Sequence, residues 1–279
     1  MKQLRAAVAE TSQLIHRAGW CANHDGNVSA RDGNRFIATP TATSKRLVAE
    51  KDLIEVDTKG AVIGHGKVFG EIGLHLVIYE RRPDVGAVVH AHPPNATAIG
   101  CSRQHPIERP FIAEALVSLG PMIPKLPYAQ PGDQARQALA PWCELVDAVI
   151  LGNHGVIAWG KDCETALLRL ELVEHLAKIA VAAAPLGGVE PLPDSAIQPL
   201  LAARAKAGIG RAADRALESA QQLLGRSLPS SPSGSAPKPV VACAPAPHSE
   251  VPVVPPSGGK PHDIAQLVRE EIVRALRNS

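Results

Sequence analysis

The chain has 279 residues, of which 45% are hydrophobic, so it is long enough for one sizeable core with an appendage. Its net charge of +2 and its 3% of aromatic residues argue against a nucleic acid or an anionic membrane as partner. The five cysteines are odd in number and form no CxxC pair, which favours reduced thiols. The N-terminus does not resemble a signal peptide, and no segment is apolar enough to span a bilayer, so we expect a cytoplasmic protein.

Residues 1–216 predict one compact α/β domain. Apolar residues at helical spacing predict a helix over residues 4–18, which Gly19 is well placed to end. The segment 23–33 is rich in turn residues. Short strands are predicted at 35–38, 53–56 and 61–63.

The rest of this domain alternates helices with apolar strands. A helix over 71–82 leads into the apolar strand 85–92. The strand 148–151 ends at the sequence Gly-Asn-His-Gly, and residues 156–159 are compatible with its continuation. Asp162 is placed to cap a long helix over 164–184. Its expected apolar stripe includes Leu168, Leu172, Leu176 and Ile179.

Composition changes abruptly after the domain. Nine of the 25 prolines fall in residues 226–260, which predicts a disordered, proline-rich linker. Residues 261–279 then show apolar residues at helical spacing, with Asp263 as a candidate N-cap. A helix this short is marginal alone in water, so its apolar stripe is expected to meet a partner.

A group of histidines predicts a metal site. His90 and His92 end an apolar run, and residues two apart on a strand point to the same side. A catalytic zinc usually has three protein ligands and one open position. His154 is the candidate third ligand, because it also follows a strand. Glu71 is the candidate acid–base group, because it begins a helix shortly before the histidine strand.

Each of these residues also has an ordinary structural explanation. A histidine at a strand end is more often hydrogen-bonded to the protein than bound to a metal. A glutamate at a helix N-terminus is usually only a favourable charge, and a Gly-Asn-His-Gly sequence is usually only a turn. Spacing alone therefore leaves both interpretations open.

Longer motifs resemble those of the class II aldolase and adducin family. They are EIGLHLVIYERRPDVGAVVHAHPP and LGNHGVIAWG, with NHDGNVSAR and ATPTATSKRL before them in the same order and spacing. The resemblance, over roughly residues 1–215, implies an α/β/α fold around a mainly antiparallel sheet, in a homotetramer with sites between subunits. It implies one zinc ion per chain held by His90, His92, His154 and Glu71, with Glu71 also the catalytic acid–base. The residues implied to hold the substrate phosphate are Gly26, Asn27, Thr41 and Ala42.

The same resemblance implies a zinc-dependent aldolase. Its expected substrate is a ketose 1-phosphate of the L-fuculose or L-rhamnulose 1-phosphate type, cleaved to dihydroxyacetone phosphate and lactaldehyde. Such cleavage leaves negative charge on an enediolate, which a zinc ion stabilises while a carboxylate moves protons. The alternatives are a sugar-phosphate epimerase or dehydratase of the same family and a non-catalytic adducin-like binding module. Glu71, where epimerases tend to have aspartate, and the three histidines, which adducin-type domains lack, favour the aldolase.

The chain differs from the family's aldolases in the residues that bind the substrate phosphate. Phe69-Gly70 stands where those aldolases have two phosphate-binding serines before the glutamate. The expected replacements are the backbone N–H of Gly70 and the side chain of Lys45 or Lys67.

A second departure concerns the residues that act on the leaving aldehyde. The family's aldolases use tyrosines to protonate or orient this aldehyde. This chain has only Tyr79, expected within a helix, and Tyr128, expected in a turn. Ala113 stands at one tyrosine position. Its neighbour Glu114 or a residue of another subunit is the expected replacement, unless the aldehyde differs.

The C-terminal helix resembles the encapsulation peptides of bacterial microcompartment enzymes. Such peptides present an apolar face to shell proteins or to one another, which implies shell proteins as partners and the microcompartment lumen as location. The alternatives are a disordered tail and a helix that docks on its own tetramer. A membrane-surface helix is disfavoured, because the polar face carries both arginines and glutamates.

Overall fold

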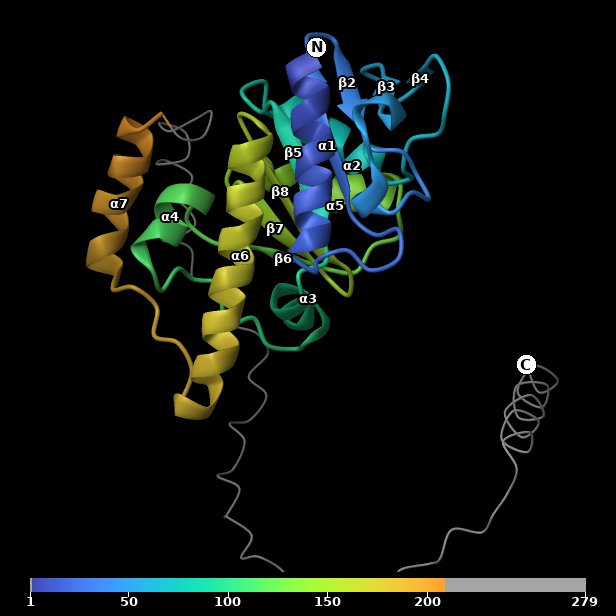
Figure 1. Ribbon diagram of the computed structural model, residues 1–279. Helices are drawn as coiled ribbons and strands as arrows, with labels where there is room; N and C mark the ends of the chain where they lie inside the picture. The colour runs from blue at the N-terminus through green and yellow to red at the C-terminus, as the bar shows by residue number, and fades with distance from the viewer. Residues whose placement is uncertain (1, 209–279) are drawn as a thin grey trace, which may run out of the picture. The chain divides into compact units, whose positions relative to one another are not determined.

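An eight-stranded sheet runs through the residues that the computed structural model describes, 2–208 (Figure 1). The strand order is β4-β3-β2-β1-β5-β8-β7-β6, and every neighbouring pair is antiparallel except β6 and β7. The strands are β1 (Asn27–Asp32), β2 (Arg35–Ala38), β3 (Ile54–Val56), β4 (Val62–Ile63), β5 (Ala87–Ala91), β6 (Lys125–Leu126), β7 (Ala148–Leu151) and β8 (Gly155–Gly160). The fold is thus the expected mixed α/β class with a mainly antiparallel sheet.

Helices cover both faces of this sheet. One buried cluster joins it to α1, α3, α4 and α6, and a second cluster on the other face joins it to α2 and α5 (Figure 1). The last helix of the described residues, α7, packs on α4. The helices are α1 (Lys2–Arg17), α2 (Ile72–Arg81), α3 (Pro94–Cys101), α4 (Ala113–Leu119), α5 (Asp133–Leu139), α6 (Cys163–Ala183) and α7 (Asp194–Lys206). Within residues 2–208, no helix combines the length and apolar character that crossing a bilayer requires.

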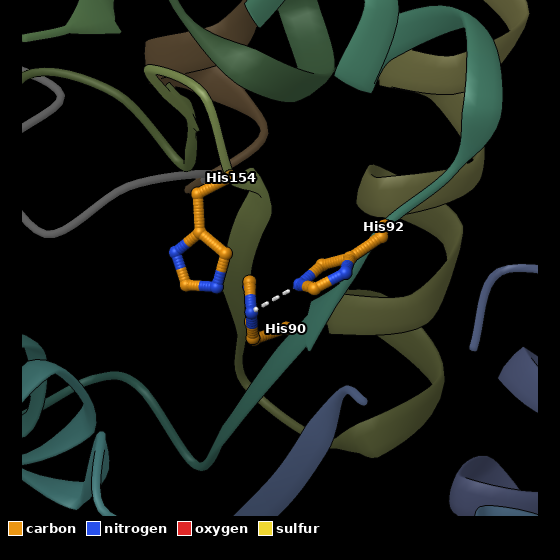
Figure 2. A group of neighbouring side chains, drawn as sticks. All are labelled: His90, His92 and His154. Carbon is orange, nitrogen blue, oxygen red and sulfur yellow. Dashed lines mark hydrogen bonds between the residues drawn. The ribbon is translucent and has the colours of Figure 1, made fainter. Parts of the chain in front are cut away.

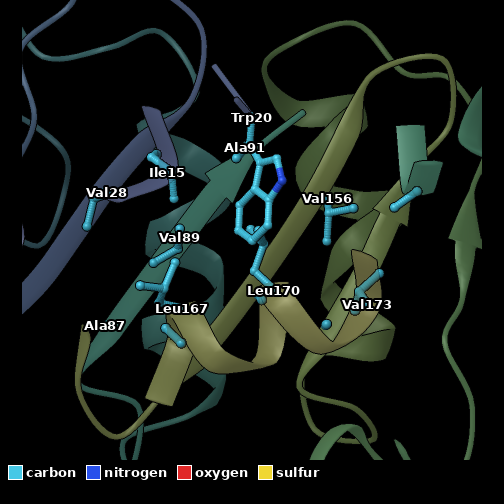
Figure 3. Close-up of a cluster of buried hydrophobic side chains, with 14 of the residues drawn as sticks. Ile15, Trp20, Val28, Ala87, Val89, Ala91, Val156, Leu167, Leu170 and Val173 are labelled. Atoms are coloured by element: carbon cyan, nitrogen blue, oxygen red, sulfur yellow. The ribbon is translucent and has the colours of Figure 1, made fainter. Parts of the chain in front are cut away.

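Strand β5 is buried on both faces, and the alternation of its side chains between these faces sets the direction of His90. Ala87, Val89 and Ala91 face the cluster that α6 covers (Figure 3). Val88 belongs to the opposite cluster, so His90, two residues on, points to the α2 face. A one-residue slip would exchange the two sets of side chains between the two cores and disrupt the packing on both faces. Packing of the two clusters therefore fixes the direction of His90.

Several predicted elements are confirmed. The first helix is α1, and Gly19 after it adopts a left-handed φ of 76°. The strands predicted at 35–38 and 148–151 are β2 and β7. Asp162 caps α6, where its carboxylate accepts a hydrogen bond from the Thr165 backbone N–H at 2.8 Å.

Other expectations were wrong. The turn-rich segment 23–33 contains β1, whose strand conformation comes from pairing with β2 and β5 on its two sides. Residues 156–159 belong to a separate strand, β8, which folds back on β7. In α6, Leu176 is buried as expected, but Leu168 is exposed and the buried stripe also runs through Leu167, Leu170 and Val173, because the helix is apolar on more than one side.

The predicted linker 226–260, the predicted helix 261–279 and the last residues of the predicted domain 1–216 lie outside the described residues.

Candidate metal centre

Three imidazoles gather at one end of the central strands (Figure 2). His90 lies near the end of β5, His92 just beyond that strand, and His154 in the turn between β7 and β8. Their ring centroids are 4.7 to 5.0 Å apart. One nitrogen from each ring lies within 4.8 Å of the other two. The three predicted ligands are therefore neighbours in space.

The β7–β8 hairpin aims His154 at the other two rings. Asn153 in its turn has a left-handed φ of 54°, a conformation that asparagine tolerates better than most residues. Gly155, directly after the turn, has no room for a side chain. An added Cβ there would lie 2.5 Å from Cδ2 of His92 and 2.6 Å from the carbonyl oxygen of Ala91. The glycine thus allows the hairpin to approach the end of β5.

The nitrogen atoms are arranged as a bound cation requires. Nδ1 of His90 lies 2.9 Å from the carbonyl oxygen of Val156, so Nδ1 carries the proton and Nε2 keeps a lone pair. Nδ1 of His92 faces the Asp25 carboxylate at 3.5 Å. The two Nε2 atoms lie 3.2 Å apart, where bare lone pairs repel each other unless a proton or a cation lies between them. Two ligands of a tetrahedral zinc with bonds of about 2.0 Å are about 3.3 Å apart, so this pair fits such an ion.

Glu71 reaches the histidines from the start of α2, on the sheet face to which His90 points. It occupies the N-cap position of α2. Its Oε1 lies 3.2 Å from Nε2 of His154, and its Oε2 lies 3.6 Å from Nε2 of His90. Asn27 lies opposite His90 in the β1–β5 pair and donates a hydrogen bond from Nδ2 to Oε2 at 2.9 Å. The carboxylate is therefore positioned between two of the candidate ligands.

Electrostatics in this cluster favour an ionised Glu71 and neutral forms of His90 and His92. Burial by itself would raise the pKa of Glu71, but His90, His154 and the Asn27 amide oppose it, and the net shift is downward. Burial lowers the pKa of His92 to about 4, and the neighbouring rings contribute to this. Burial also lowers the pKa of His90. Ionised carboxylate and neutral imidazole are the forms that coordinate metal ions.

A polar cavity of about 240 Å³ opens beside the histidines. Glu71, His92 and His154 form one side of it. The four residues predicted to contact the substrate all line it as well, namely Gly26, Asn27, Thr41 and Ala42.

Lys45 also lines this polar cavity, although its side chain is almost completely buried, at 2% exposure. Its Nζ donates to the carbonyl oxygens of His24 and Thr43, each at 2.9 Å. Burial lowers the pKa of this ammonium group. An ammonium group has three N–H donors, so two carbonyl partners leave one donor for a ligand.

A second, apolar cavity of about 250 Å³ shares Glu71 and His154 with the polar one. Tyr128 lines it and is 63% exposed, which makes it the tyrosine near the candidate centre. The apolar part of the lining includes Leu74, Leu126, Pro127, Ala135, Ala138 and Leu151.

Other predicted residues lie away from the centre. Tyr79 is in α2, as expected, but it is buried and its hydroxyl donates to the carbonyl oxygen of Ser29 at 2.9 Å. Glu114, in the first turn of α4, and Lys67 are exposed and line neither cavity. Within one chain, neither is therefore positioned to replace the missing serines or tyrosines.

Three contributions were missed from the sequence. Asp25 was interpreted only as a turn residue, and Gly155 only as a flanking glycine. The Val156 carbonyl, a backbone group that selects the protonation of His90, carries no sequence signal at all. Each depends on a neighbour that only folding brings near.

Proteins of known family are similar to this chain over most of the described residues. The sequence profile described as "Class II Aldolase and Adducin N-terminal domain" matches residues 6–181. An L-fuculose phosphate aldolase of Methanococcus maripaludis strain C7 is 32% identical over 168 residues, which are 60% of this chain and 89% of the relative. A 3-oxo-tetronate 4-phosphate decarboxylase of Pectobacterium atrosepticum is 29% identical over 184 residues, which are 64% and 84%. A solved L-fuculose 1-phosphate aldolase superposes with a TM-score of 0.66 at 25% identity, covering 72% of this chain and 95% of that one.

Proposed function

Because the chain belongs to the class II aldolase and adducin family and is a lyase of the aldolase type, we propose that it cleaves a ketose 1-phosphate with the help of zinc. The proposed substrate is of the L-fuculose or L-rhamnulose 1-phosphate type, and the products are dihydroxyacetone phosphate and lactaldehyde. The observation that carries this proposal is the Glu71 carboxylate, 3.2 and 3.6 Å from the nitrogens of His154 and His90.

The metal is proposed to be held by His90, His92 and His154, with Glu71 as a further ligand in the resting state. A zinc ion there supplies Lewis-acid stabilisation for the negative charge that develops on the substrate. The neutral state of the buried imidazoles supports this, because neutral ligands leave the positive charge of the ion undiminished.

Glu71 is proposed to move one proton during cleavage. The C4 hydroxyl loses its proton to the carboxylate and its oxygen becomes the aldehyde carbonyl, while the C3–C4 bond breaks and its electron pair stays on the C3 side. Glu71 then donates the same proton to C3, which completes dihydroxyacetone phosphate. Its lowered pKa means that it begins as the base, as this order requires.

The phosphate is proposed to bind in the polar cavity. Gly26, Asn27, Thr41 and Ala42 line it, and Lys45 adds a buried positive charge whose polar partners are two carbonyl oxygens. Burial of this cation is costly, the attraction of Asp25 offsets part of the cost, and an entering phosphate would compensate more of it. Lys45 thus takes over from the two serines that Phe69-Gly70 replaces.

The aldehyde end is proposed to lie in the apolar cavity, where Tyr128 is available to orient the carbonyl. The methyl group of lactaldehyde suits this lining.

Decarboxylation of a 3-oxo acid phosphate is the second candidate function, because the Pectobacterium relative is a decarboxylase whose sequence identity to this chain is similar to that of the aldolase. Among the described residues that line this cavity there is no lysine or arginine for a substrate carboxylate, which favours aldol cleavage.

Product assays on the purified full-length protein test the proposal. Zinc-loaded enzyme should release dihydroxyacetone phosphate from L-fuculose or L-rhamnulose 1-phosphate and little CO2 from 3-oxo-tetronate 4-phosphate. Chelation should abolish the release, and zinc should restore it. CO2 release without dihydroxyacetone phosphate would replace the proposal by decarboxylation, and activity in the metal-free protein would contradict the metal's role.

We also propose the homotetramer with shared sites and the encapsulation of the enzyme through residues 261–279, which lie outside the described residues. Light scattering should give the mass of four chains. A fluorescent protein fused to residues 261–279 should form foci when it is expressed with shell proteins, and diffuse fluorescence would argue against encapsulation.

A further inference from the structure

A third cavity, of about 430 Å³, lies at the other end of the same strands. Gly160, the last residue of β8, lines it and pairs with Ala87 at the start of β5, whereas the histidines lie where β5 ends and β8 begins. Its polar lining comes from the loop before β5, from α4 and from the beginning of α6, and consists of Arg82, Asp84, Ser118, Lys161, Thr165 and Arg169.

Buried arginines form one wall of this third cavity. The side chains of Arg82 and Arg169 are 2% and 9% exposed. Arg82 lies 3.0 Å and Arg169 lies 3.3 Å from the carboxylate of Asp147, which is fully buried. Arg204, in α7, pairs with the same carboxylate. One negatively charged carboxylate is thus shared by three positively charged guanidinium groups, which leaves an excess of positive charge.

The remaining charges do not compensate this excess. Asp84 pairs with Arg82 at 2.8 Å, and the Asp162 carboxylate is engaged in capping α6. Lys161 adds another cation. Lys161 and Asp162 are exposed, and their opposite charges cancel. The buried Arg82, Arg169 and Arg204 against the buried Asp147 and the partly exposed Asp84 then leave one positive charge, in a place where buried charge needs a partner.

The environment of Arg169 is both buried and cationic. Burial lowers its pKa, and repulsion from Arg204 and Arg82 opposes the attraction of Asp147. Its Nη1 donates to the Trp159 carbonyl oxygen and its Nη2 pairs with Asp147. These contacts engage two of the five N–H donors that a guanidinium group carries.

We propose that this third cavity is a second anion-binding site, separate from the proposed catalytic centre, for a small organic anion bearing a phosphate or a carboxylate group. Arg169, Lys161 and the hydroxyl of Thr165 are the ligand-contacting groups. One bound negative charge brings the net charge of the cluster to zero. The volume admits a small metabolite, and the ligand contacts the loop before β5 and the end of β8, the strands that carry the candidate metal ligands at their other ends.

Equilibrium dialysis of labelled inorganic phosphate and labelled malonate against full-length, zinc-loaded protein tests this site. The two probes distinguish a phosphate site from a carboxylate site. Lys161→Glu reverses the sign of the net charge, from +1 to −1, at an exposed position that does not disturb the core. Lys51→Glu makes the same charge change at an exposed position in another part of the domain and is the matched control.

We expect wild type and Lys51→Glu to bind at least one of the probes in a class of sites that Lys161→Glu weakens about tenfold or more, as loss of a charge-assisted hydrogen bond implies. Lys161→Met should give an intermediate loss. The site is overturned if no binding class responds to Lys161, or if Lys51→Glu weakens binding equally. Turnover without added anion should be the same in Lys161→Glu as in wild type, so failure of this site is distinguishable from failure of the proposed reaction.

Discussion

The imidazole of His92 occupies the space that a side chain on Gly155 would need. A Cβ on Gly155 would lie 2.5 Å from Cδ2 of His92, where carbon atoms in contact need about 3.5–4.0 Å. The hairpin that carries His154 and the strand that carries His90 therefore meet only because residue 155 has no side chain.

Gly155→Ala is accordingly expected to disrupt the metal centre more than the fold. Overpacking costs about 1–3 kcal/mol and moves the imidazoles apart, so zinc affinity should fall at least about tenfold while the circular dichroism spectrum is kept. Competition with a chromophoric chelator measures the affinity. Gly70→Ala is the control, because an added Cβ there meets no atom within 4 Å. Equal zinc affinity in wild type and Gly155→Ala would contradict the steric argument.

Glu71→Gln should separate proton transfer from metal binding. The amide oxygen of glutamine still accepts from Asn27, but it cannot take a proton, so kcat should fall about 10²- to 10⁴-fold. Three histidines remain, so the zinc content per chain should stay near that of wild type. Steady-state kinetics and metal analysis measure the two quantities. Turnover as fast as wild type would rule out Glu71 as the acid–base.

Lys45→Met should weaken binding of the substrate phosphate. The substitution keeps most of the apolar stem and removes the ammonium group, so the KM of the ketose phosphate should rise about tenfold or more relative to that of the unphosphorylated ketose. Lys67→Met is the control, because Lys67 is exposed and does not line the polar cavity. A KM ratio equal to that of wild type would remove Lys45 from phosphate binding. Thermal denaturation of the variant should be measured alongside the kinetics to detect any loss of stability, because the carbonyl oxygens of His24 and Thr43 lose their hydrogen-bond donor.

His105 should make the domain acid-sensitive. Its Nε2–H donates to the Ile123 carbonyl oxygen at 2.6 Å, and among the described residues its buried Nδ1 has no hydrogen-bond partner. Burial, opposed in part by that hydrogen bond, lowers the pKa of His105 to about 4. In the unfolded chain the pKa is about 6.5. Between these values the unfolded chain binds more protons, so the free energy of unfolding decreases as the pH falls from about 6.5 to about 4.

The comparison variant is His105→Gln, which keeps a donor for the Ile123 carbonyl. Urea denaturation of metal-free protein at pH 7 and pH 4.5 should show a smaller loss of stability for this variant than for wild type. The metal-free form is used so that zinc dissociation does not contribute. An identical loss in both proteins would show that His105 does not titrate on unfolding.

Local signals explain which elements were predictable. α1 and α6 are long, amphipathic and bounded by Gly19 and Asp162, and β7 is a short apolar run before a turn. β1 has no such signal, because its strand conformation depends on pairing with β5, where Asn27 lies opposite His90. The short helices α3, α4 and α5 were missed, since one or two turns carry too few residues for a periodic pattern.

The sequence by itself determined which residues are available for chemistry: His90, His92, His154 and Glu71, and the absence of serines at Phe69-Gly70. Only the tertiary structure decided how they meet. The alternation of β5 between two cores directs His90 to the α2 face, and the β7–β8 hairpin brings His154 within 3.2 Å of Glu71. Such distances depend on sheet register and helix packing between residues dozens of positions apart, which a local pattern does not contain.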